Sequence, residues 1–223
     1  DLTNFHKPYT ALIRNKITPI LLNNTVTGRN ISLVISQDEF KRALNVIHGE
    51  IFGVAKKINI AIFGHGTVGG TLISQILESA KNIEKRKGIK LNVFAIANSK
   101  KVLLNKFGIS ENWKATLEDK GQDYKVEDII AYAKEHHLEN LIAIDNTASS
   151  TFIENYISLA ENSFDLISSN KVANTVSFDF YKTLRKVLKD NQKEYLYETN
   201  VGAGLPLIDT IKLLHLSGEN ITK

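Results

Sequence analysis

A glycine-rich hexapeptide gives the first indication of chemistry in this chain. Gly64-His65-Gly66-Thr67-Val68-Gly69 fits the pattern G-x-G-x-x-G, follows an apolar run at 58–63, and precedes apolar residues at helical spacing. In such a strand–loop–helix unit the first glycine permits a tight turn. The second lets backbone approach a pyrophosphate, and the third lets helix and strand pack closely. A plain glycine turn is the alternative, but the flanking elements favour a dinucleotide site, where N–H groups at the helix start face the phosphates.

The residues after the next expected strand, 91–97, bear on which dinucleotide is bound. A carboxylate at this point accepts from a ribose 2′-hydroxyl, whereas cations accommodate a 2′-phosphate. The chain reads Asn98-Ser99-Lys100-Lys101, which offers an amide, a hydroxyl and two ammonium groups but no carboxylate. NADP(H) is therefore favoured over NAD(H), the alternative being that both lysines are simply solvated.

The elements that position these residues alternate between strand and helix from Lys57 onward. This alternation predicts an α/β fold with a Rossmann-type doubly wound parallel sheet covered on both faces. Strands are expected at 58–63, 91–97, 141–145, 164–168 and 194–198. Helices are expected at 67–87, 126–136, 152–161 and 178–191.

The first fifty residues follow another pattern. Two β-branched runs at 17–23 and 30–36 predict neighbouring strands, and apolar residues at helical spacing follow Ser36. Residues 11–14 are interpreted as the end of an earlier helix, and residues 49–57 as a linker. Together these elements make only part of a domain.

The composition is that of a globular protein, with 43% hydrophobic and 23% charged residues and a net charge of +4. Lysines and acids alternate, which indicates solvated helix faces rather than a nucleic-acid surface. There is no apolar run near the roughly 18 residues that span a bilayer, and no secretory signal, so no membrane partner and a cytoplasmic protein are expected. The chain lacks methionine and begins at Asp1, from which we expect a piece of a longer protein.

Three further motifs sharpen the interpretation: Asp145-Asn146-Thr147-Ala148-Ser149, Ser168-Ser169-Asn170-Lys171-Val172-Ala173-Asn174, and Glu198-Thr199-Asn200-Val201-Gly202-Ala203-Gly204-Leu205-Pro206. With the glycine loop they resemble homoserine dehydrogenase, most closely the dehydrogenase part of bifunctional aspartokinase/homoserine dehydrogenase. The similarity runs from about Lys57 to Lys223, and residues 11–52 resemble the last part of an ACT-type regulatory module. The resemblance divides the chain into a partial ACT-like module with its linker at 1–54, an NAD(P)-binding Rossmann domain at 55–200, and the start of a substrate and dimerisation region at 201–223.

The resemblance implies a reaction. The family reduces aspartate β-semialdehyde to homoserine with NAD(P)H, on the route from aspartate to threonine and methionine. Its substrate domain should lie beyond Lys223, so the chain alone is expected to be catalytically incomplete. Homo-oligomerisation and threonine regulation of the full-length protein are also expected. The alternative is a non-catalytic nucleotide-sensing module. An acylating semialdehyde dehydrogenase is disfavoured because that chemistry needs a cysteine, and the chain has none.

The resemblance also assigns roles to residues. Lys171 is expected between cofactor and substrate, where its ammonium would stabilise charge growing on the aldehyde oxygen. Thr147 is expected next to the nicotinamide. Glu198 and the backbone carbonyls of Val201, Ala203 and Leu205 match a monovalent cation site, with oxygen ligands that suit Na⁺. The alternatives are a solvated Lys171 and a plain tight turn at the glycines. The expected cofactor-binding residues are Phe63, Gly64, Gly66, Thr67, Val68, Gly69, Asn98, Ser99, Lys100, Thr147, Ala148 and Lys171.

Overall fold

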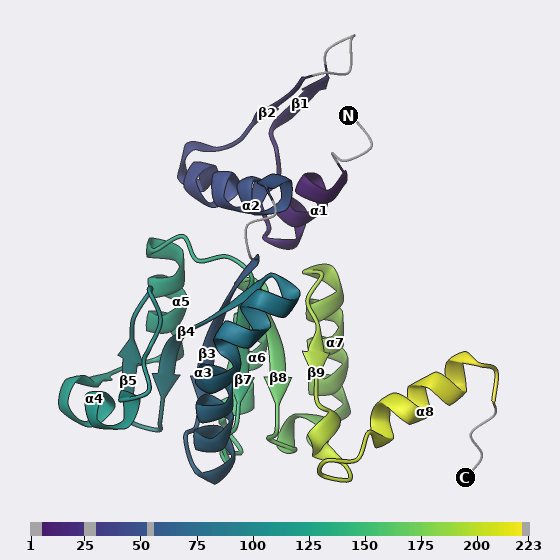
Figure 1. Cartoon of the computed structure of the whole chain (residues 1–223). Coiled ribbons are helices and arrows are strands. Elements are labelled where there is room, and N and C mark those ends of the chain that lie inside the picture. Colours follow the sequence, from purple (N-terminus) through teal and green to yellow (C-terminus); the bar gives the residue numbers. More distant parts are fainter. Residues whose placement is uncertain (1–5, 25–29, 53–55, 220–223) are drawn as a thin grey trace.

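A seven-stranded sheet forms the centre of the computed structural model, which describes residues 6–24, 30–52 and 56–219 (Figure 1). The strand order is β6-β5-β4-β3-β7-β8-β9. The four neighbouring pairs within β4-β3-β7-β8-β9 are all parallel. Their bounds are β3 Lys56–Phe63, β4 Ile89–Ala97, β5 Lys101–Leu104, β6 Gln122–Asp123, β7 Leu141–Asp145, β8 Phe164–Ser168 and β9 Tyr195–Leu196. The Rossmann-type arrangement is confirmed.

One side of the sheet differs from the predicted all-parallel arrangement. β5 pairs antiparallel with β4, and β6 pairs antiparallel with β5. Between β5 and β6 lies a helix that was also not predicted, α4 (Trp113–Lys120). The direct turn at 98–100 allows the antiparallel pairing, because a parallel neighbour would need a long crossover connection.

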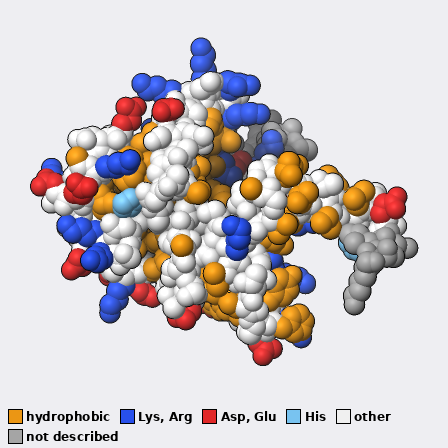
Figure 2. All heavy atoms as spheres, turned by 90° about the horizontal axis from the view of Figure 1, so that it is seen from below, with side chains coloured by type: hydrophobic (Ala, Val, Ile, Leu, Met, Phe, Trp, Pro, Cys, Tyr) orange, Lys and Arg blue, Asp and Glu red, His pale blue; other side chains and the backbone are white. Residues whose placement is uncertain are grey.

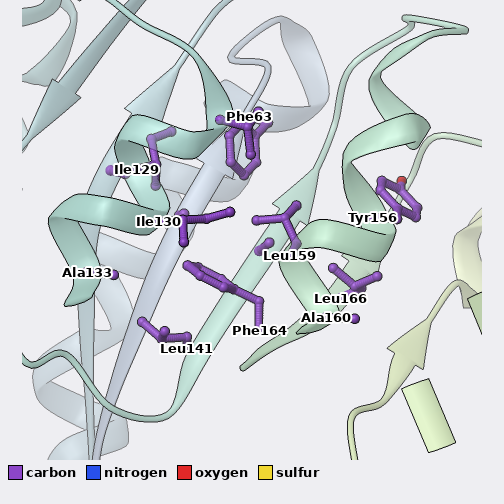
Figure 3. Close-up of a cluster of buried hydrophobic side chains, with 14 of the residues drawn as sticks. Phe63, Ile129, Ile130, Ala133, Leu141, Tyr156, Leu159, Ala160, Phe164 and Leu166 are labelled. Atoms are coloured by element: carbon purple, nitrogen blue, oxygen red, sulfur yellow. The ribbon is translucent and has the colours of Figure 1, made fainter. Parts of the chain in front are cut away.

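Helices cover both faces of the sheet. α3 (Thr67–Lys87) and α4 cover one face, and α5 (Val126–Glu135), α6 (Asn155–Glu161) and α7 (Phe178–Asp190) cover the other. Side chains of β3 alternate between the two cores, as period-2 strands require. Ile60 and Ile62 pack with α3, whereas Ala61 and Phe63 belong to the core beneath α5 and α6 (Figure 3). Short 3₁₀ turns complete the domain at Phe152–Glu154, Val172–Asn174 and Glu198–Asn200.

Helix α3 has the bounds that the sequence predicted, and its two ends explain why. It begins after Gly66 and ends at Gly88, which adopts a left-handed conformation (φ 62°) and donates its N–H to the Glu84 carbonyl. A left-handed glycine is the common helix terminator. The last turn carries Lys85, Arg86 and Lys87, whose charges favour the negative end of the helix dipole. The positive end of α3 consequently faces the carboxyl edge of the sheet.

The N-terminal segment folds as a hairpin with two helices. It contains α1 (His6–Arg14), the antiparallel strands β1 (Leu21–Asn24) and β2 (Ile31–Val34), a 3₁₀ turn at Gln37–Glu39, and α2 (Phe40–Phe52). A small core joins Leu12 and Ile17 with Ala43 and Val46. The first strand begins later than predicted because Ile17 is buried in this core before the strand starts. The linker expected from residue 49 is wrong at its start, since α2 continues to Phe52. The ACT-like assignment and the domain boundaries stay predictions.

This N-terminal unit contacts the amino edge of the sheet, at the end opposite the glycine loop (Figure 1). The Asn15 side-chain oxygen accepts from the Asn140 N–H just before β7 (2.9 Å), and Asn15 is only 4% exposed. The Lys193 ammonium donates to the Arg14 carbonyl (2.9 Å) at the end of α1, and Lys16 donates to the Glu161 carbonyl. Polar contacts therefore fix the end of α1 against the sheet.

The last helix, α8 (Leu207–Leu216), projects away from the sheet. None of the α8 residues is buried, so this helix does not pack on the sheet. Figure 2 shows hydrophobic side chains along the projecting arm. The exposed members include Leu207, Ile211, Leu213, Leu214 and Leu216. No helix of the described residues is long and apolar enough to cross a membrane.

Candidate functional site

Four strand ends meet in register at the carboxyl edge of the sheet. Phe63 pairs with Ala97 on one side and with Asp145 on the other, and Asp145 pairs with Ser168. The loops that follow these residues therefore line one edge, which Figure 2 views end-on; charged side chains there lie mostly toward the rim. The chain order reverses between β3 and β7, and such a switch point is where open α/β sheets bind ligands.

The first and third glycines of the loop are required by packing. Gly64 has a left-handed φ of 83°, and a Cβ there would lie 2.9 Å from the backbone carbonyl of Asn146. A Cβ on Gly69 would lie 1.9 Å from the Gly64 carbonyl oxygen. These two positions bring the glycine loop against the end of β7, as the motif predicted.

Gly66 is different, because a Cβ on it would meet no described atom within 4 Å. It is the N-cap of α3, and none of the described side chains caps this helix end. The first helical bond runs from the Gly70 N–H to the Gly66 carbonyl (2.7 Å), so the N–H groups of Thr67 and Val68 precede it. Exposed Gly66, Thr67 and Val68 thus form an open helix N-terminus that fits a phosphate group. Phe63 is 1% exposed and supports the loop from below.

The turn after β4 is organised by Asn98. Its side-chain oxygen accepts from the backbone N–H groups of Lys100 (2.8 Å) and Lys101 (2.7 Å). The Tyr124 hydroxyl donates to the Asn98 carbonyl (2.8 Å), and burial raises the pKa of Tyr124 to about 12. Ser99 and Lys100 are exposed at the tip of the turn. Asn98 is therefore a turn-forming residue, and Ser99 and Lys100 are free to face a ligand.

A cavity of about 300 Å³ lies beside this turn. The His65 ring packs edge-on against Trp113 at 5.3 Å, and its Nε2 lies 3.3 Å from the Asn98 side-chain nitrogen. Position 65 is variable in the G-x-G-x-x-G pattern, so the motif gives no role to His65, and the sequence does not point to Trp113 because α4 was not predicted. The cavity also has two ammonium groups in its lining. Its residues are His65, Asn98, Lys101, Trp113, Lys114, Leu117 and Glu118.

The two lysines differ in their availability. The Lys101 ammonium donates to the Glu118 carbonyl (3.1 Å), so it is partly occupied by the protein. The Lys114 ammonium lies 5.5 Å from the centre of the Trp113 ring, a cation–π distance that leaves its N–H donors open.

The loop after β7 begins with a side-chain turn. Asp145, which is 2% exposed, accepts from the Thr147 N–H (2.7 Å), and the Thr147 hydroxyl accepts from the Ser149 N–H (3.3 Å). Ser149 in turn accepts from the Phe152 N–H (3.1 Å) and starts the 3₁₀ turn at Phe152–Glu154. Thr147 is half-buried and Ala148 exposed, so both lie at the edge beside Gly64.

Lys171 lies in the loop after β8, on the neighbouring strand end. Its side chain is exposed, and its neighbour Asn170 is 4% exposed. The Asn170 side-chain nitrogen lies 3.4 Å from the Thr147 hydroxyl, which brings the two loops together. The structure therefore places the glycine loop, Thr147 and the Lys171 loop along one edge.

The predicted cation ligands lie apart from this group, before α8. Both oxygens of Glu198 accept helix N–H groups, from Ile208 (2.9 Å) and Asp209 (3.0 Å), so Glu198 caps α8. Val201, Ala203 and Leu205 are exposed. Within the described ranges no group of three or more His, Cys, Asp or Glu side chains could hold a metal ion. The predicted site, with three carbonyls and one carboxylate, is of another kind and stays a prediction.

Comparisons with known proteins agree with this geometry. The model of the family described as homoserine dehydrogenase, NAD-binding domain, matches residues 64–198. A bifunctional aspartokinase/homoserine dehydrogenase of Buchnera aphidicola is 37% identical over 217 residues, 96% of this chain and 26% of that protein. A protein of the same description from Haemophilus influenzae is 32% identical over 96% of this chain and 26% of its own length. The chain thus spans about a quarter of these relatives.

Solved structures give the same picture. Homoserine dehydrogenase from Thermoplasma acidophilum matches with a TM-score of 0.59 at 17% identity, over 73% of this chain and 49% of that chain, which shows the fold. A hyperthermophilic archaeal homoserine dehydrogenase in complex with NADPH matches with a TM-score of 0.55 at 25% identity, over 70% of this chain and 48% of that chain. The open helix N-terminus at the switch point and the family match over more than half of the chain lead to one conclusion: the chain belongs to the homoserine dehydrogenase family and contains its NAD-binding domain.

Proposed function

We propose that this chain is the NADP(H)-binding part of an oxidoreductase that interconverts aspartate β-semialdehyde and homoserine. The open N-terminus of α3 carries this proposal: Gly66 leaves space for a phosphate group, while Gly64 and Gly69 pack the loop against the sheet. The residues present fit a dinucleotide. The free N–H groups at the start of α3 and the space that Gly66 leaves by having no side chain lie together at the carboxyl edge of the sheet. The archaeal relative in complex with NADPH supports the proposal.

The preference for NADP(H) rests on the turn after β4. The turn has exposed Ser99 and Lys100 and no carboxylate, and Lys114 lies in the wall of the adjoining cavity. Ammonium groups and a hydroxyl recognise a 2′-phosphate, whereas an unmodified ribose would leave them without a partner. We therefore assign the cavity beside His65 to the adenosine end of the cofactor.

The catalytic edge follows from the same orientation. A cofactor whose pyrophosphate lies at Gly66 and whose adenosine lies beside Asn98 must direct its other end across the sheet toward Thr147 and Lys171. Bound there, the nicotinamide supplies the hydride. Lys171 provides an exposed ammonium, which stabilises the negative charge that develops on the aldehyde oxygen. Thr147 offers a hydroxyl beside the same region.

The proposal also includes a cation site, regulation by threonine and homo-oligomerisation. Glu198 retains lone pairs while it caps α8, so it can join the carbonyls of Val201, Ala203 and Leu205 around Na⁺. The helices and hairpin of residues 6–52 support an ACT-like unit for threonine regulation. The exposed apolar side chains of α8 support homo-oligomerisation, since such side chains need a partner surface.

The test is a fluorescence titration of the purified chain with NADPH and with NADH. NADPH should bind more tightly, and Lys100→Gln should weaken NADPH binding about fivefold, as the loss of about 1 kcal/mol requires, without changing NADH binding. Lys90→Gln is the matched control, because Lys90 is exposed on β4 at the opposite edge of the sheet. Equal affinity for the two cofactors would refute the NADP(H) preference. A cooperative melt with no binding of either would refute the function.

A further inference from the structure

Asp145 is a buried carboxylate to which the resemblance assigns no role. It ends β7, is 2% exposed, and uses both carboxylate oxygens. Oδ1 accepts from the Thr147 N–H (2.7 Å), and Oδ2 accepts from the Tyr156 hydroxyl (2.7 Å) and the Asn170 side-chain N–H (3.1 Å). The same carboxylate therefore contacts the Thr147 loop, the residue before Lys171, and helix α6.

Asn170 completes the link between the loops. Its side-chain nitrogen also donates to the Ser149 carbonyl (2.9 Å), and its side-chain oxygen accepts from the Val172 N–H (3.0 Å). Asn170 therefore binds the Val172 N–H, which directly follows Lys171 in the chain. It also binds Asp145 at the end of the neighbouring strand β7. Because Asn170 is buried, this link is shielded from water and its geometry is well defined.

The donors to Asp145 are all neutral. Burial, and then the neighbouring Asp145 charge, raise the pKa of Tyr156 above its ordinary value, so its hydroxyl stays a donor. The recorded ion pairs of the described residues do not include Asp145. A buried carboxylate without a cation is costly unless hydrogen bonds satisfy it, and here three hydrogen bonds hold Asp145 between the two loops and α6.

We propose that Asp145 is a positioning residue that fixes the distance between Thr147 and Lys171 at the nicotinamide end of the cofactor site. The inference rests on the proposed function, because it assumes that these two residues face the nicotinamide. Because Asp145 is buried, it acts through the Thr147 N–H and through Asn170.

Asp145→Asn tests this with little change of shape. The asparagine oxygen can still accept from the Thr147 N–H, and its new amide can donate to the Tyr156 oxygen. Only the contact with Asn170 becomes unfavourable, because two amide N–H groups then face each other. The readout compares the affinity for NADPH with that for 2′-phospho-ADP-ribose, which lacks the nicotinamide. Asp145→Asn should weaken NADPH binding about three- to tenfold, and leave 2′-phospho-ADP-ribose binding unchanged.

Tyr156→Phe is the matched control. It removes a hydrogen bond to the same carboxylate oxygen but leaves both loop contacts in place, so it should lower the melting temperature without changing either affinity. If Asp145→Asn does not fold, Asn170→Ser breaks the same link from the other side and gives the same comparison. Equal weakening of both ligands, or of neither, by the folded variant would overturn the positioning role. If the wild-type chain bound neither ligand, the proposed function itself would fail.

Discussion

Gly66→Ala separates cofactor binding from folding. A Cβ at this position meets no described atom within 4 Å, and the backbone φ of −64° is one that alanine adopts readily. Because alanine is a poorer N-cap than glycine, the unfolding free energy should fall slightly, by no more than about 1 kcal/mol. The added methyl group would instead occupy the space in front of the α3 N-terminus. Displacing the phosphate there removes at least one charge-assisted hydrogen bond, about 1.5–3 kcal/mol, or about ten- to 150-fold in Kd.

The assay pairs urea unfolding with NADPH titration for the wild type, Gly66→Ala and Gly49→Ala. Gly49 lies in α2, and a Cβ on it also meets no described atom within 4 Å. Gly49→Ala should bind NADPH like the wild type. Unchanged NADPH affinity in Gly66→Ala would refute the assignment of the phosphates to this helix end. A large loss of stability in Gly66→Ala would refute the view that the position is open.

Three further changes test other parts of the structure. Gly69→Ala places a Cβ 1.9 Å from the Gly64 carbonyl oxygen and should lower the unfolding free energy by about 1–3 kcal/mol in urea unfolding; wild-type stability would contradict the close packing. The pKa of Tyr124 is about 12 in the folded state and about 10 when unfolded, so the unfolded chain loses this proton first and stability falls between pH 10 and 12. Tyr124→Phe should show a smaller decline over that range, and an identical decline would exclude Tyr124 as its source. Glu198→Gln leaves only one acceptor for two helix N–H groups, so amide hydrogen exchange should accelerate in α8 but not in α3; equal protection in α8 would contradict the capping role.

The fold was predicted best where the spacing of apolar residues and the residues that end an element, such as glycine, indicate the same bounds. The bounds of α3, β7 and β8 were predicted to the residue, because glycines mark α3 and short, mainly apolar segments mark the buried parallel strands. α4 was missed because its sequence buries only Trp113 and Leu117, too few for a helical pattern. β6 was missed because it has two exposed residues and no apolar signal.

The candidate site shows the same division. The glycine loop can be recognised from the sequence because its three glycines lie within six residues at a fixed spacing. The His65–Trp113 contact and the Asp145–Asn170 bond join residues far apart in the chain. Both depend on how α4 folds back and on the register that pairs Asp145 with Ser168, and a single sequence specifies neither.

The contact of the N-terminal unit with the amino edge has an energetic consequence. Strand β3 separates that edge from the glycine loop by seven steps of about 3.3 Å, roughly 23 Å in all. Sites further apart than about 10 Å with no shared partners usually have additive effects. In the chain without an effector, the effects of substitutions at Asn15 or Lys193 on the unfolding free energy should therefore add to those of substitutions at Gly66. Strand β3 thus works as a spacer, so that a change which loosens the contact of the N-terminal unit leaves the stability of the loop around Gly66 unaffected.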